Sequence, residues 1–346
     1  MFKLLEYNDK YRSSWNDFAR EKGTIFHTIE WKEVLEETFG YKSIYMMVVG
    51  EDCDVVGLIP VLTGRNILMR KIGVSLPFVN HADICCKDPE AFRYIIDKLS
   101  DLSNESRLHY LEMRFKEQTL EENITVDKHN YTFILPLDGG EDGVLSLSTG
   151  DNRNHVRKVC KNGQFEVSFD YNRLEEFYKV WRKRQKQLGT PDHGIKLFMK
   201  IKEKFPDNAF LLSVLEKGQD KVLGGMFLIT WKDTVYYPWG GAMTEYNKKH
   251  INEFMYWEAV KFGIHNGFKY LDLGRSPYNP DSGTYRAKKK WGAEPVQLKY
   301  YKLGQMPGGE HVLSQDKLGI MVSAWKVLPE FITNALGRYL IKYVMP

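Results

Sequence analysis

The stretch LDLGRSPYNPDSGTYRAKKKWG, residues 271–292, holds the most informative residues of this chain. It begins inside an apolar segment, 270–273, which predicts a buried strand. Asp272, Gly274 and Arg275 stand where that strand ends, and three consecutive lysines, 288–290, follow further along. Charged residues beside the end of a buried strand are typical of binding and catalytic loops. Asp272 and Arg275 are therefore candidate functional residues beside a turn at the end of a strand.

The residues before this stretch predict another strand and then a helix. The strand 234–239 ends in Trp239-Gly240-Gly241-Ala242, and the polar loop 244–251 follows it. We expect a helix over 252–266 with Asn252 as its N-cap. The free N–H groups at a helix N-terminus attract anions, so this order predicts a notch for a phosphorylated or acyl carrier.

Further outward, the chain repeats one order of predicted elements: helix, helix, strand, turn, strand. Short β-branched and aromatic runs joined by Gly/Asp turns are typical of antiparallel hairpins. The two copies lie about 165 residues apart, and a glycine follows the turn in each, which favours a duplicated domain. The predicted elements are 14–21, 30–38, 44–49 and 55–62 in the first copy, and 173–188, 195–205, 209–215 and 222–230 in the second.

Composition indicates a globular chain with uneven charge. Of 346 residues, 43% are hydrophobic and 27% are charged, which excludes a largely disordered protein. Residues 1–150 hold 17 Lys/Arg and 25 Asp/Glu, a net charge of −8, whereas residues 151–346 hold 32 and 20, a net charge of +12. The second half is therefore the half expected to attract a phosphate-bearing ligand.

The sequence predicts a cytoplasmic protein with reduced thiols and no metal. The segment 1–22 is charged and lacks the apolar core of a signal peptide, and no apolar run reaches the length of a membrane span. The four cysteines show no C-x-x-C spacing. The histidines have no carboxylate or cysteine partner at metal-binding spacing, so we expect no zinc site; they are His81, His155, His193 and His250.

The ordered motifs of the chain resemble the FemAB family, the peptidoglycan-bridge aminoacyltransferases, and within it the FemAB-like proteins of exosortase/PEP-CTERM systems. The resemblance spans nearly the whole chain. Two positions depart from the subgroup: His81-Ala82 replaces a usual Gly-Gly pair, and Ala287 replaces a usual aromatic residue. The matching residues are Phe26-His27, Trp31, 75–80, 153–158, Asp272, Gly274, Arg275, Ser276, Gly283, Tyr285, Lys288, Trp291, Gly292, 325–329 and 336–337.

This resemblance implies an α/β fold of mixed sheets with two tandem GNAT-like domains, over 1–149 and 150–304, and a helical tail over 305–346. It also implies transfer of an acyl or aminoacyl group to an amine of a cell-envelope or exopolysaccharide precursor. Acyl-CoA or aminoacyl-tRNA would be the donor, with no tightly bound cofactor. A CoA-dependent N-acyltransferase of a nucleotide sugar and a non-catalytic scaffold of the envelope machinery remain as alternatives.

Attack of an amine on an ester or thioester requires alignment and stabilisation of an oxyanion, but no covalent nucleophile. We expect Lys288 to neutralise the oxyanion or a donor phosphate, unless it belongs to a solvated basic face. Asp272 is expected to orient a water that accepts the proton, or else to cap its own turn. The planar fork of Arg275 suits a phosphate or a carboxylate.

The expected substrate-binding residues fall into three groups. A helix that opens at Asp151 presents basic residues that would bind phosphates of a nucleotide or a tRNA, or else would only be solvated. Aromatic and polar residues after the strand 234–239 would line an acyl pocket, or else belong to the core. The full set is Arg153, Asn154, Arg157, Lys158, Trp239, Gly240, Gly241, Tyr246, Asn247, Arg275, Ser276 and Tyr285.

The C-terminal tail leaves two interpretations open. Residues 318–344 are apolar and aromatic, and Pro329 divides them into two helical pieces. The tail either docks on the inner membrane leaflet as an amphipathic segment, through Leu318–Val344, or closes the core. No DNA-binding motif is present, and the expected partners are the envelope precursor and, for an aminoacyl donor, tRNA.

Overall fold

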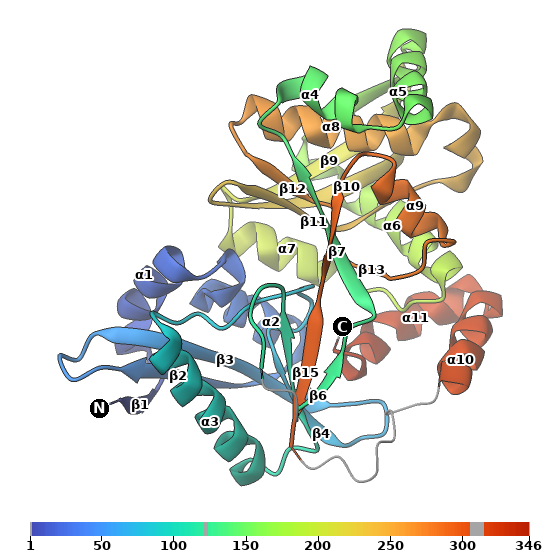
Figure 1. Ribbon diagram of the computed structural model, residues 1–346. Helices are drawn as coiled ribbons and strands as arrows, with labels where there is room; N and C mark the ends of the chain where they lie inside the picture. The colour runs from blue at the N-terminus through green and yellow to red at the C-terminus, as the bar shows by residue number, and fades with distance from the viewer. Residues whose placement is uncertain (1, 121–123, 305–314, 346) are drawn as a thin grey trace. The chain divides into compact units, whose positions relative to one another are not determined.

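The computed structural model describes residues 2–120, 124–304 and 315–345 (Figure 1). The chain forms two compact units, each built from segments that are separated in the sequence. Unit 1 comprises 1–128, 191–204 and 298–346, and unit 2 comprises 129–190 and 205–297.

Unit 1 contains a mixed seven-stranded sheet in the order β1-β2-β3-β4-β5-β15-β6. All neighbours are antiparallel except β4 and β5, which run parallel. Its strands are β1 (Lys3–Glu6), β2 (Lys42–Val49), β3 (Val55–Arg65), β4 (Lys71–Ser75), β5 (Leu111–Phe115), β6 (Thr125–Asp127) and β15 (Lys299–Leu303). Its helices are α1 (Arg12–Lys22), α2 (Ile29–Phe39), α3 (Pro89–Glu105), α7 (Ile195–Lys204), α10 (Gln315–Val327) and α11 (Glu330–Leu340), with a short η6 (Ile341–Tyr343).

Unit 2 contains an eight-stranded sheet in the order β13-β7-β12-β11-β10-β9-β8, with β14 also paired to β7. β11 and β12 run parallel, and the other pairs are antiparallel. Its strands are β7 (Asn130–Pro136), β8 (Phe165–Ser168), β9 (Ala209–Glu216), β10 (Val222–Trp231), β11 (Thr234–Ala242), β12 (Tyr270–Asp272), β13 (Ser276–Pro277) and β14 (Glu294–Gln297). Its helices are α4 (Gly140–Leu147), α5 (Gly150–Asn162), α6 (Leu174–Leu188), α8 (Ile251–His265) and α9 (Gly283–Lys289), with η4 (Thr244–Lys249) before α8.

The compact units differ from the ranges 1–149 and 150–304 expected from the sequence. β7 precedes the expected boundary, yet it pairs with β12, β13 and β14 of unit 2. The segment that follows the motif forms two strands, of which β14 joins the sheet of unit 2 and β15 joins the sheet of unit 1. Strand pairing between distant segments decides this exchange, and no local sequence pattern reports it. Part of the expected tail, 305–314 and 346, lies outside the described residues.

The repeated elements form as expected, but the second helix of the second copy lies in unit 1. Both antiparallel hairpins, β2–β3 and β9–β10, are present. α7 packs on α2, where the Lys204 ammonium lies 2.8 Å from the Glu33 carboxylate and Lys200 lies 2.7 Å from Glu37. The helix expected over 195–205 is therefore correct as a local structure, while its neighbour comes from the other copy.

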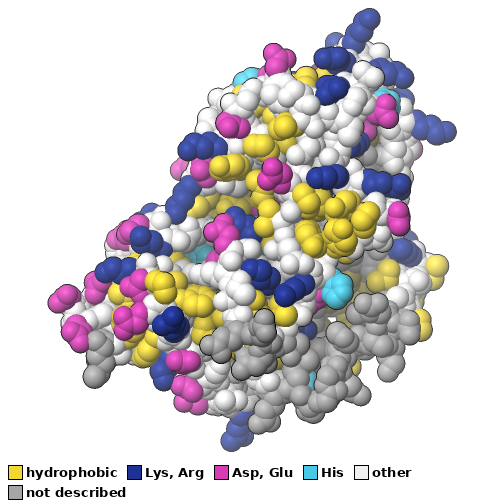
Figure 2. All heavy atoms as spheres, viewed as in Figure 1, with side chains coloured by type: hydrophobic (Ala, Val, Ile, Leu, Met, Phe, Trp, Pro, Cys, Tyr) yellow, Lys and Arg dark blue, Asp and Glu magenta, His cyan; other side chains and the backbone are white. Residues whose placement is uncertain are grey.

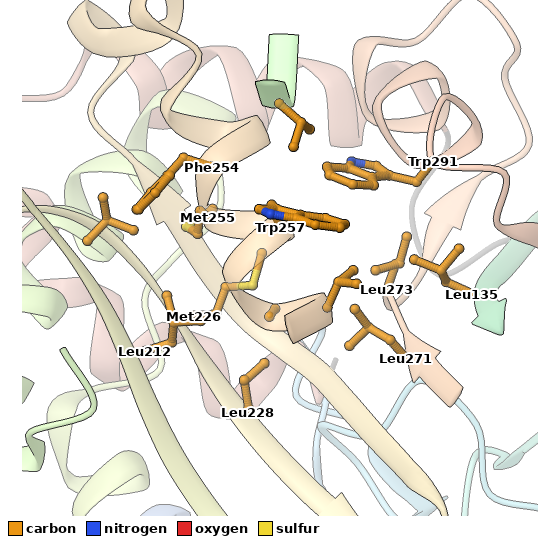
Figure 3. Close-up of a cluster of buried hydrophobic side chains, with 14 of the residues drawn as sticks. Leu135, Leu212, Met226, Leu228, Phe254, Met255, Trp257, Leu271, Leu273 and Trp291 are labelled. Atoms are coloured by element: carbon orange, nitrogen blue, oxygen red, sulfur yellow. The ribbon is translucent and has the colours of Figure 1, made fainter. Parts of the chain in front are cut away.

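The core of unit 2 explains the Trp-Gly pair that ends the motif of residues 271–292. Figure 3 shows the ring of Trp291 lying over Trp257 of α8, with Leu135, Leu271 and Leu273 close to the two rings. The indole planes of Trp257 and Trp291 are 9° apart, with centroids separated by 6.4 Å. Gly292 has a φ of +80°, and a Cβ there would lie 2.6 Å from the carbonyl oxygen of Leu147. Packing thus requires both residues of the pair.

In unit 1 the buried Arg114 connects β5 to Val79 and to Met345. The Arg114 guanidinium lies 2.9 Å from the Glu112 carboxylate and donates to the backbone carbonyls of Val79 and Met345. Burial lowers the pKa of Arg114, but Glu112 together with Tyr300 and Tyr110 outweighs this effect, so the pKa is raised. This cation is fully paired and serves the fold.

Charge is unevenly distributed over the surface, as the composition predicts. On the face in Figure 2, Asp and Glu side chains gather where Figure 1 shows the β2–β3 hairpin, and Lys and Arg side chains gather where it shows α5. Among the described helices, none combines the length and the hydropathy that a membrane span requires.

Candidate active site

The candidate site lies where the pairing of β11 with β12 ends in unit 2. The parallel ladder joins only Thr234–Tyr236 to Tyr270–Asp272, whereas β11 continues beside β10 as far as Ala242. Asp272 is thus the last paired residue of β12. Two residues later Gly274 adopts a φ of +77°, which turns the chain toward β13.

Asp272 is buried and organises this turn. Its Oδ1 accepts a hydrogen bond from the Gly274 backbone N–H at 2.8 Å and another from the Thr132 hydroxyl at 2.5 Å. The alternative of a turn cap, left open by the sequence, is therefore what the structure contains. The Asp272 carboxylate nevertheless remains close enough to raise the pKa of Lys288, so it acts on Lys288 as a positioning charge.

Lys288 is the buried cation of the site. Its side chain is 7% exposed, and its Nζ donates to the carbonyl oxygens of Gly274 at 2.7 Å and Arg275 at 2.9 Å. The same Nζ lies 5.5 Å from the centroid of the Phe133 ring. Burial lowers the pKa of Lys288 to about 7, with Asp272 opposing the shift and Arg275 adding to it.

The helix α9 places this one lysine inward and its neighbours elsewhere. Ser282 caps the helix by accepting from the Tyr285 backbone N–H at 3.2 Å. Lys289 is exposed, and Lys290 lies 2.6 Å from the Glu253 carboxylate. The interpretation of residues 288–290 as an entirely solvated basic face is therefore wrong for Lys288.

The remaining residues of the motif surround Lys288. Arg275 has an exposed side chain, and its carbonyl is one of the two acceptors of Lys288. Ser276 is buried in β13, where it pairs with Tyr131. The Tyr285 ring packs edge-on against Phe133, with centroids 5.2 Å apart. The structure thus brings Lys288, Asp272, Arg275, Ser276 and Tyr285 together.

Sequence reasoning did not single out Thr132 and Phe133 of β7, although both touch the site. Thr132 is fully buried and bonds Asp272, and Phe133 lies beneath the Lys288 ammonium. The signal was a lone hydroxyl residue in the apolar run Tyr-Thr-Phe-Ile-Leu over 131–135. This residue did not point to the site, because the expected domain boundary at 149/150 placed the strand in the first domain and Lys288 in the second.

The basic residues of α5 do not join Lys288 in any hydrogen bond or ion pair of the described residues. Arg153 donates to the carbonyl oxygens of Leu145, Ser146 and Ser148, so it caps the C-terminal end of α4. Asn154, Arg157 and Lys158 are exposed on the helix. One guanidinium nitrogen of Arg153, Nη1, thus has a structural role, and the binding of a phosphate by Arg153 stays a prediction.

The residues expected to line an acyl pocket lie at the end of β11 and in the loop that follows it. Trp239 is buried and packs against Phe227, as a core residue does. Gly240 and Gly241 leave room for neighbours, since a Cβ would meet Tyr237 at 2.5 Å in the first case and Arg184 at 3.0 Å in the second. The Tyr246 hydroxyl donates to Glu216, and Asn247 accepts from Asn252.

Two expectations about α8 are wrong. The helix begins one residue early, so its N-cap is His250 with a φ of +61°, and Asn252 instead donates to Asn247. In addition, His155 and His250 do have a carboxylate neighbour, because donor atoms of His155, His250 and Glu253 lie within 4.8 Å of one another. The fold brings α5 and α8 together, which sequence spacing did not show.

This cluster is nevertheless not arranged to hold a metal ion. The two imidazole rings stack, with planes 22° apart and centroids separated by 4.1 Å. Lone pairs of imidazole lie in the ring plane, so nearly parallel stacked rings do not converge on one ion. Lys290 already bonds the Glu253 carboxylate at 2.6 Å.

Comparisons with known proteins bear on this site. Residues 150–289, which include Asp272 and Lys288, match the family described as an acetyltransferase (GNAT) domain. A search of curated protein sequences finds no match.

Several solved structures share the fold. FemX is similar with a TM-score of 0.64 at 15% identity, over 92% of this chain and 100% of FemX. L-PGS from Bacillus licheniformis gives a TM-score of 0.57 at 12% identity, over 94% and 98% of the two chains. A tandem GNAT protein from the clavulanic acid biosynthesis pathway gives 0.53 at 8% identity, over 88% and 100%.

The chain thus has a mixed α/β fold, and residues 150–289 within it match a GNAT acetyltransferase domain, which indicates an acyltransferase. The likeness to FemX, at 15% identity, is a likeness of fold over nearly the full length of both chains.

Proposed function

We propose that this acyltransferase moves an acyl or aminoacyl group onto an amine of a cell-envelope or exopolysaccharide precursor, by direct attack and without a covalent enzyme intermediate. The family motifs around Lys288 support this class of reaction. The likeness in fold to FemX and to the C-terminal domain of a putative lysylphosphatidylglycerol synthetase from Agrobacterium fabrum, the latter at 10% identity and a TM-score of 0.58, supports an envelope acceptor.

The observation that carries the proposal is the state of Lys288. With a pKa of about 7, its amine is largely neutral at slightly alkaline pH. A neutral amine has two N–H donors and one lone pair, and both donors are occupied by the carbonyls of Gly274 and Arg275. The lone pair therefore remains available to accept a proton, a better use for this side chain than the fixed positive charge expected from the sequence.

In the proposed reaction one bond forms, one bond breaks and one proton passes through Lys288. The acceptor amine attacks the carbonyl carbon of the donor, a new C–N bond forms, and the proton of the amine passes to Lys288 Nζ. The C–S bond of a thioester donor or the C–O bond of an ester donor breaks. Lys288 returns the proton to the leaving sulfur or oxygen. Asp272 holds the turn on which the two carbonyl acceptors of Lys288 lie.

Two donors fit this chemistry, and each has its own support. The acetyltransferase domain match over 150–289 favours acyl-CoA. The FemAB resemblance and the exposed Arg157 and Lys158 favour an aminoacyl-tRNA, whose binding would weaken steeply with salt. A nucleotide sugar is the acceptor of the second candidate, the CoA-dependent N-acyltransferase.

The decisive experiment compares Lys288→Met with Lys289→Met in transfer assays with labelled acetyl-CoA and charged tRNA. Methionine replaces the aliphatic part of lysine and removes its amine, and Lys289 is the exposed neighbour on the same helix. We expect Lys288→Met to lose about 10²–10⁴-fold in rate while it stays folded, and Lys289→Met to keep its rate. Equal rates for the two variants would refute the assignment, and full biological complementation by Lys288→Met would favour a scaffold.

A further inference from the structure

The β3–β4 hairpin of unit 1 presents an apolar tip. Ile67, Leu68 and Met69 are 37%, 45% and 54% exposed. The tip is held in shape by Asn66, whose side-chain oxygen accepts from the backbone N–H groups of Leu68 and Arg70, each at 3.0 Å. Three consecutive apolar side chains are thus fixed outward on an ordered turn.

Two cavities flank this hairpin, and their ionisable side chains are basic. One has a volume of about 360 Å³ and is lined by Lys42, Arg65, Lys71 and Lys342 together with Tyr41 and Tyr343. The other has a volume of about 680 Å³ and is lined by Arg70, Lys71, Arg107 and His109. Among the described residues that line them, neither cavity contains an Asp or a Glu.

Carboxylates of the described residues do not neutralise the charges of Arg65, Lys71 and Lys342. Arg65 donates to the backbone carbonyl of Met69, and Lys71 donates to that of Ser106. No ion pair among the described residues includes Arg65, Lys71 or Lys342. The cluster is the more unusual because the first 150 residues carry a net charge of −8. A positive site in an acidic segment indicates an anionic ligand.

The C-terminal helix α11 adds a second apolar surface to unit 1. Its buried side consists of small or polar residues, Thr333 and Gly337, whereas Phe331 is 74% exposed. Tyr339, Leu336 and Leu340 are also exposed, which reverses the usual orientation of an amphipathic helix. Lys342 and Tyr343, just after α11, line the smaller cavity, so the tail meets the base of the hairpin there.

We propose that unit 1 docks on a bilayer that contains anionic phospholipid. The hairpin tip and the exposed face of α11 enter the interface, and the two basic cavities take lipid phosphates. Apolar side chains beside basic ones are the combination that anionic bilayers bind, since the first gain burial among acyl chains and the second are attracted to the headgroups. The occupant is a lipid surface, because a bilayer offers anionic phosphates directly beside acyl chains, as the basic cavities beside exposed apolar side chains require.

Vesicle sedimentation of the full chain tests the proposal. The probes are phosphatidylcholine vesicles and vesicles with 30% phosphatidylglycerol, roughly the anionic regime where each Lys or Arg contributes about 1 kcal/mol, or about fivefold in binding. We expect binding only to the anionic vesicles. Arg65→Gln/Lys71→Gln should weaken it about 25-fold, and Leu68→Ser/Met69→Ser should weaken it at least tenfold.

Matched controls separate local from general effects. Lys217→Gln/Lys221→Gln removes the same charge from the exposed β9–β10 turn, and Leu188→Ser/Met199→Ser removes two exposed apolar side chains elsewhere. Both controls should bind as the parent chain does. The proposal fails if the parent chain ignores anionic vesicles, if the hairpin variants bind like the controls, or if those variants change only the oligomeric state.

This docking does not depend on the proposed transferase activity. The sedimentation assay contains no donor or acceptor, so a failure of one proposal leaves the other standing. Millimolar inorganic phosphate should not displace the protein from vesicles, and displacement would instead indicate a soluble phosphate ligand.

Discussion

Among the described residues, each unit buries one Lys or Arg side chain, and the surroundings of the two side chains differ. Arg114 in unit 1 lies against a carboxylate and two backbone carbonyls, and its pKa is raised. Lys288 in unit 2 makes its two hydrogen bonds to backbone carbonyls, and its pKa is lowered to about 7. A buried charge with a full set of partners fixes structure, whereas a buried amine poised near neutrality can exchange a proton.

Because their surroundings differ, we expect Arg114 to contribute mainly to stability and Lys288 mainly to activity. Removing one partner of a buried ion pair leaves the other uncompensated, which is costly. Removing a buried amine that is already largely neutral leaves two carbonyls to be rehydrated and eliminates a desolvated charge. Unit 1 should therefore depend on its cation for folding, and unit 2 should depend on its cation for chemistry.

The largest expected effect on stability comes from Arg114→Ala. We expect the free energy of unfolding of unit 1 to fall by about 3–5 kcal/mol, because Glu112 stays buried without its partner. Urea unfolding of the full chain measures this. Arg93→Ala, an exposed arginine on α3, is the control and should change stability by about 0.5 kcal/mol or less. Lys288→Met should resemble the control, and a loss as large as that of Arg114→Ala would erase the contrast between the cations.

A smaller effect on stability tests the packing of Gly292, which follows Lys288 in the motif of residues 271–292. Gly292→Ala should cost unit 2 about 2–4 kcal/mol, since the residue combines a φ of +80° with a Cβ position 2.6 Å from Leu147 O. Gly267→Ala has a similar φ of +75° with nothing within 4 Å, so about 1–2 kcal/mol is expected. Thermal unfolding of both variants checks the difference. Equal losses would mean that contact with Leu147 is unimportant.

The pH dependence of the transfer reaction tests whether Lys288 acts as a proton acceptor, in contrast to the fixed charge of Arg114. Because neutral Lys288 is the proton acceptor, kcat/KM should fall about tenfold per pH unit below its pKa of about 7 and level off above it. The folded pKa lies below the unfolded value of 10.5, so the unfolded chain binds more protons between the two, and stability of unit 2 should rise with pH over this window. A rate that declines as pH rises through 7 would instead indicate a cationic role.

The smallest expected effect belongs to unit 1 and lies in a separate pH window. The hydrogen bond from Arg12, followed by Lys204, lowers the pKa of Glu33 to about 2 from 4.5. The folded pKa is depressed, so this contribution is present above pH 4.5 and lost as pH falls toward 2. Partial exposure limits it to about 1 kcal/mol. Hydrogen exchange of α2 peptides should show the loss, and Glu33→Gln should lack this acid dependence.

Much of the local structure could be predicted from the sequence. The hairpins β2–β3 and β9–β10 follow from short apolar runs and Gly/Asp turns, and α6 forms over nearly the range expected for it, 173–188. The motif of residues 271–292 located Lys288 and Asp272, and the Asp-x-Gly spacing left the turn cap open as an alternative. These features depend on residues close together in the chain.

The environment of Lys288 could not be predicted in the same way. Thr132 and Phe133 reach the site from more than one hundred residues away, because β7 pairs with β12 and not with the strands of the segment in which it occurs. The same holds for α7, whose ion pairs with α2 join the two copies of the repeat.

The sequence by itself determined the elements, the repeat and the motif, because turn chemistry, hydrophobic period and charge are local properties of the chain. Only the tertiary structure decided which lysine of three is buried, that its pKa falls to about 7, and that Arg153 caps the end of α4. Burial and pairing depend on which distant segments pack together, and electrostatic free energy depends on burial.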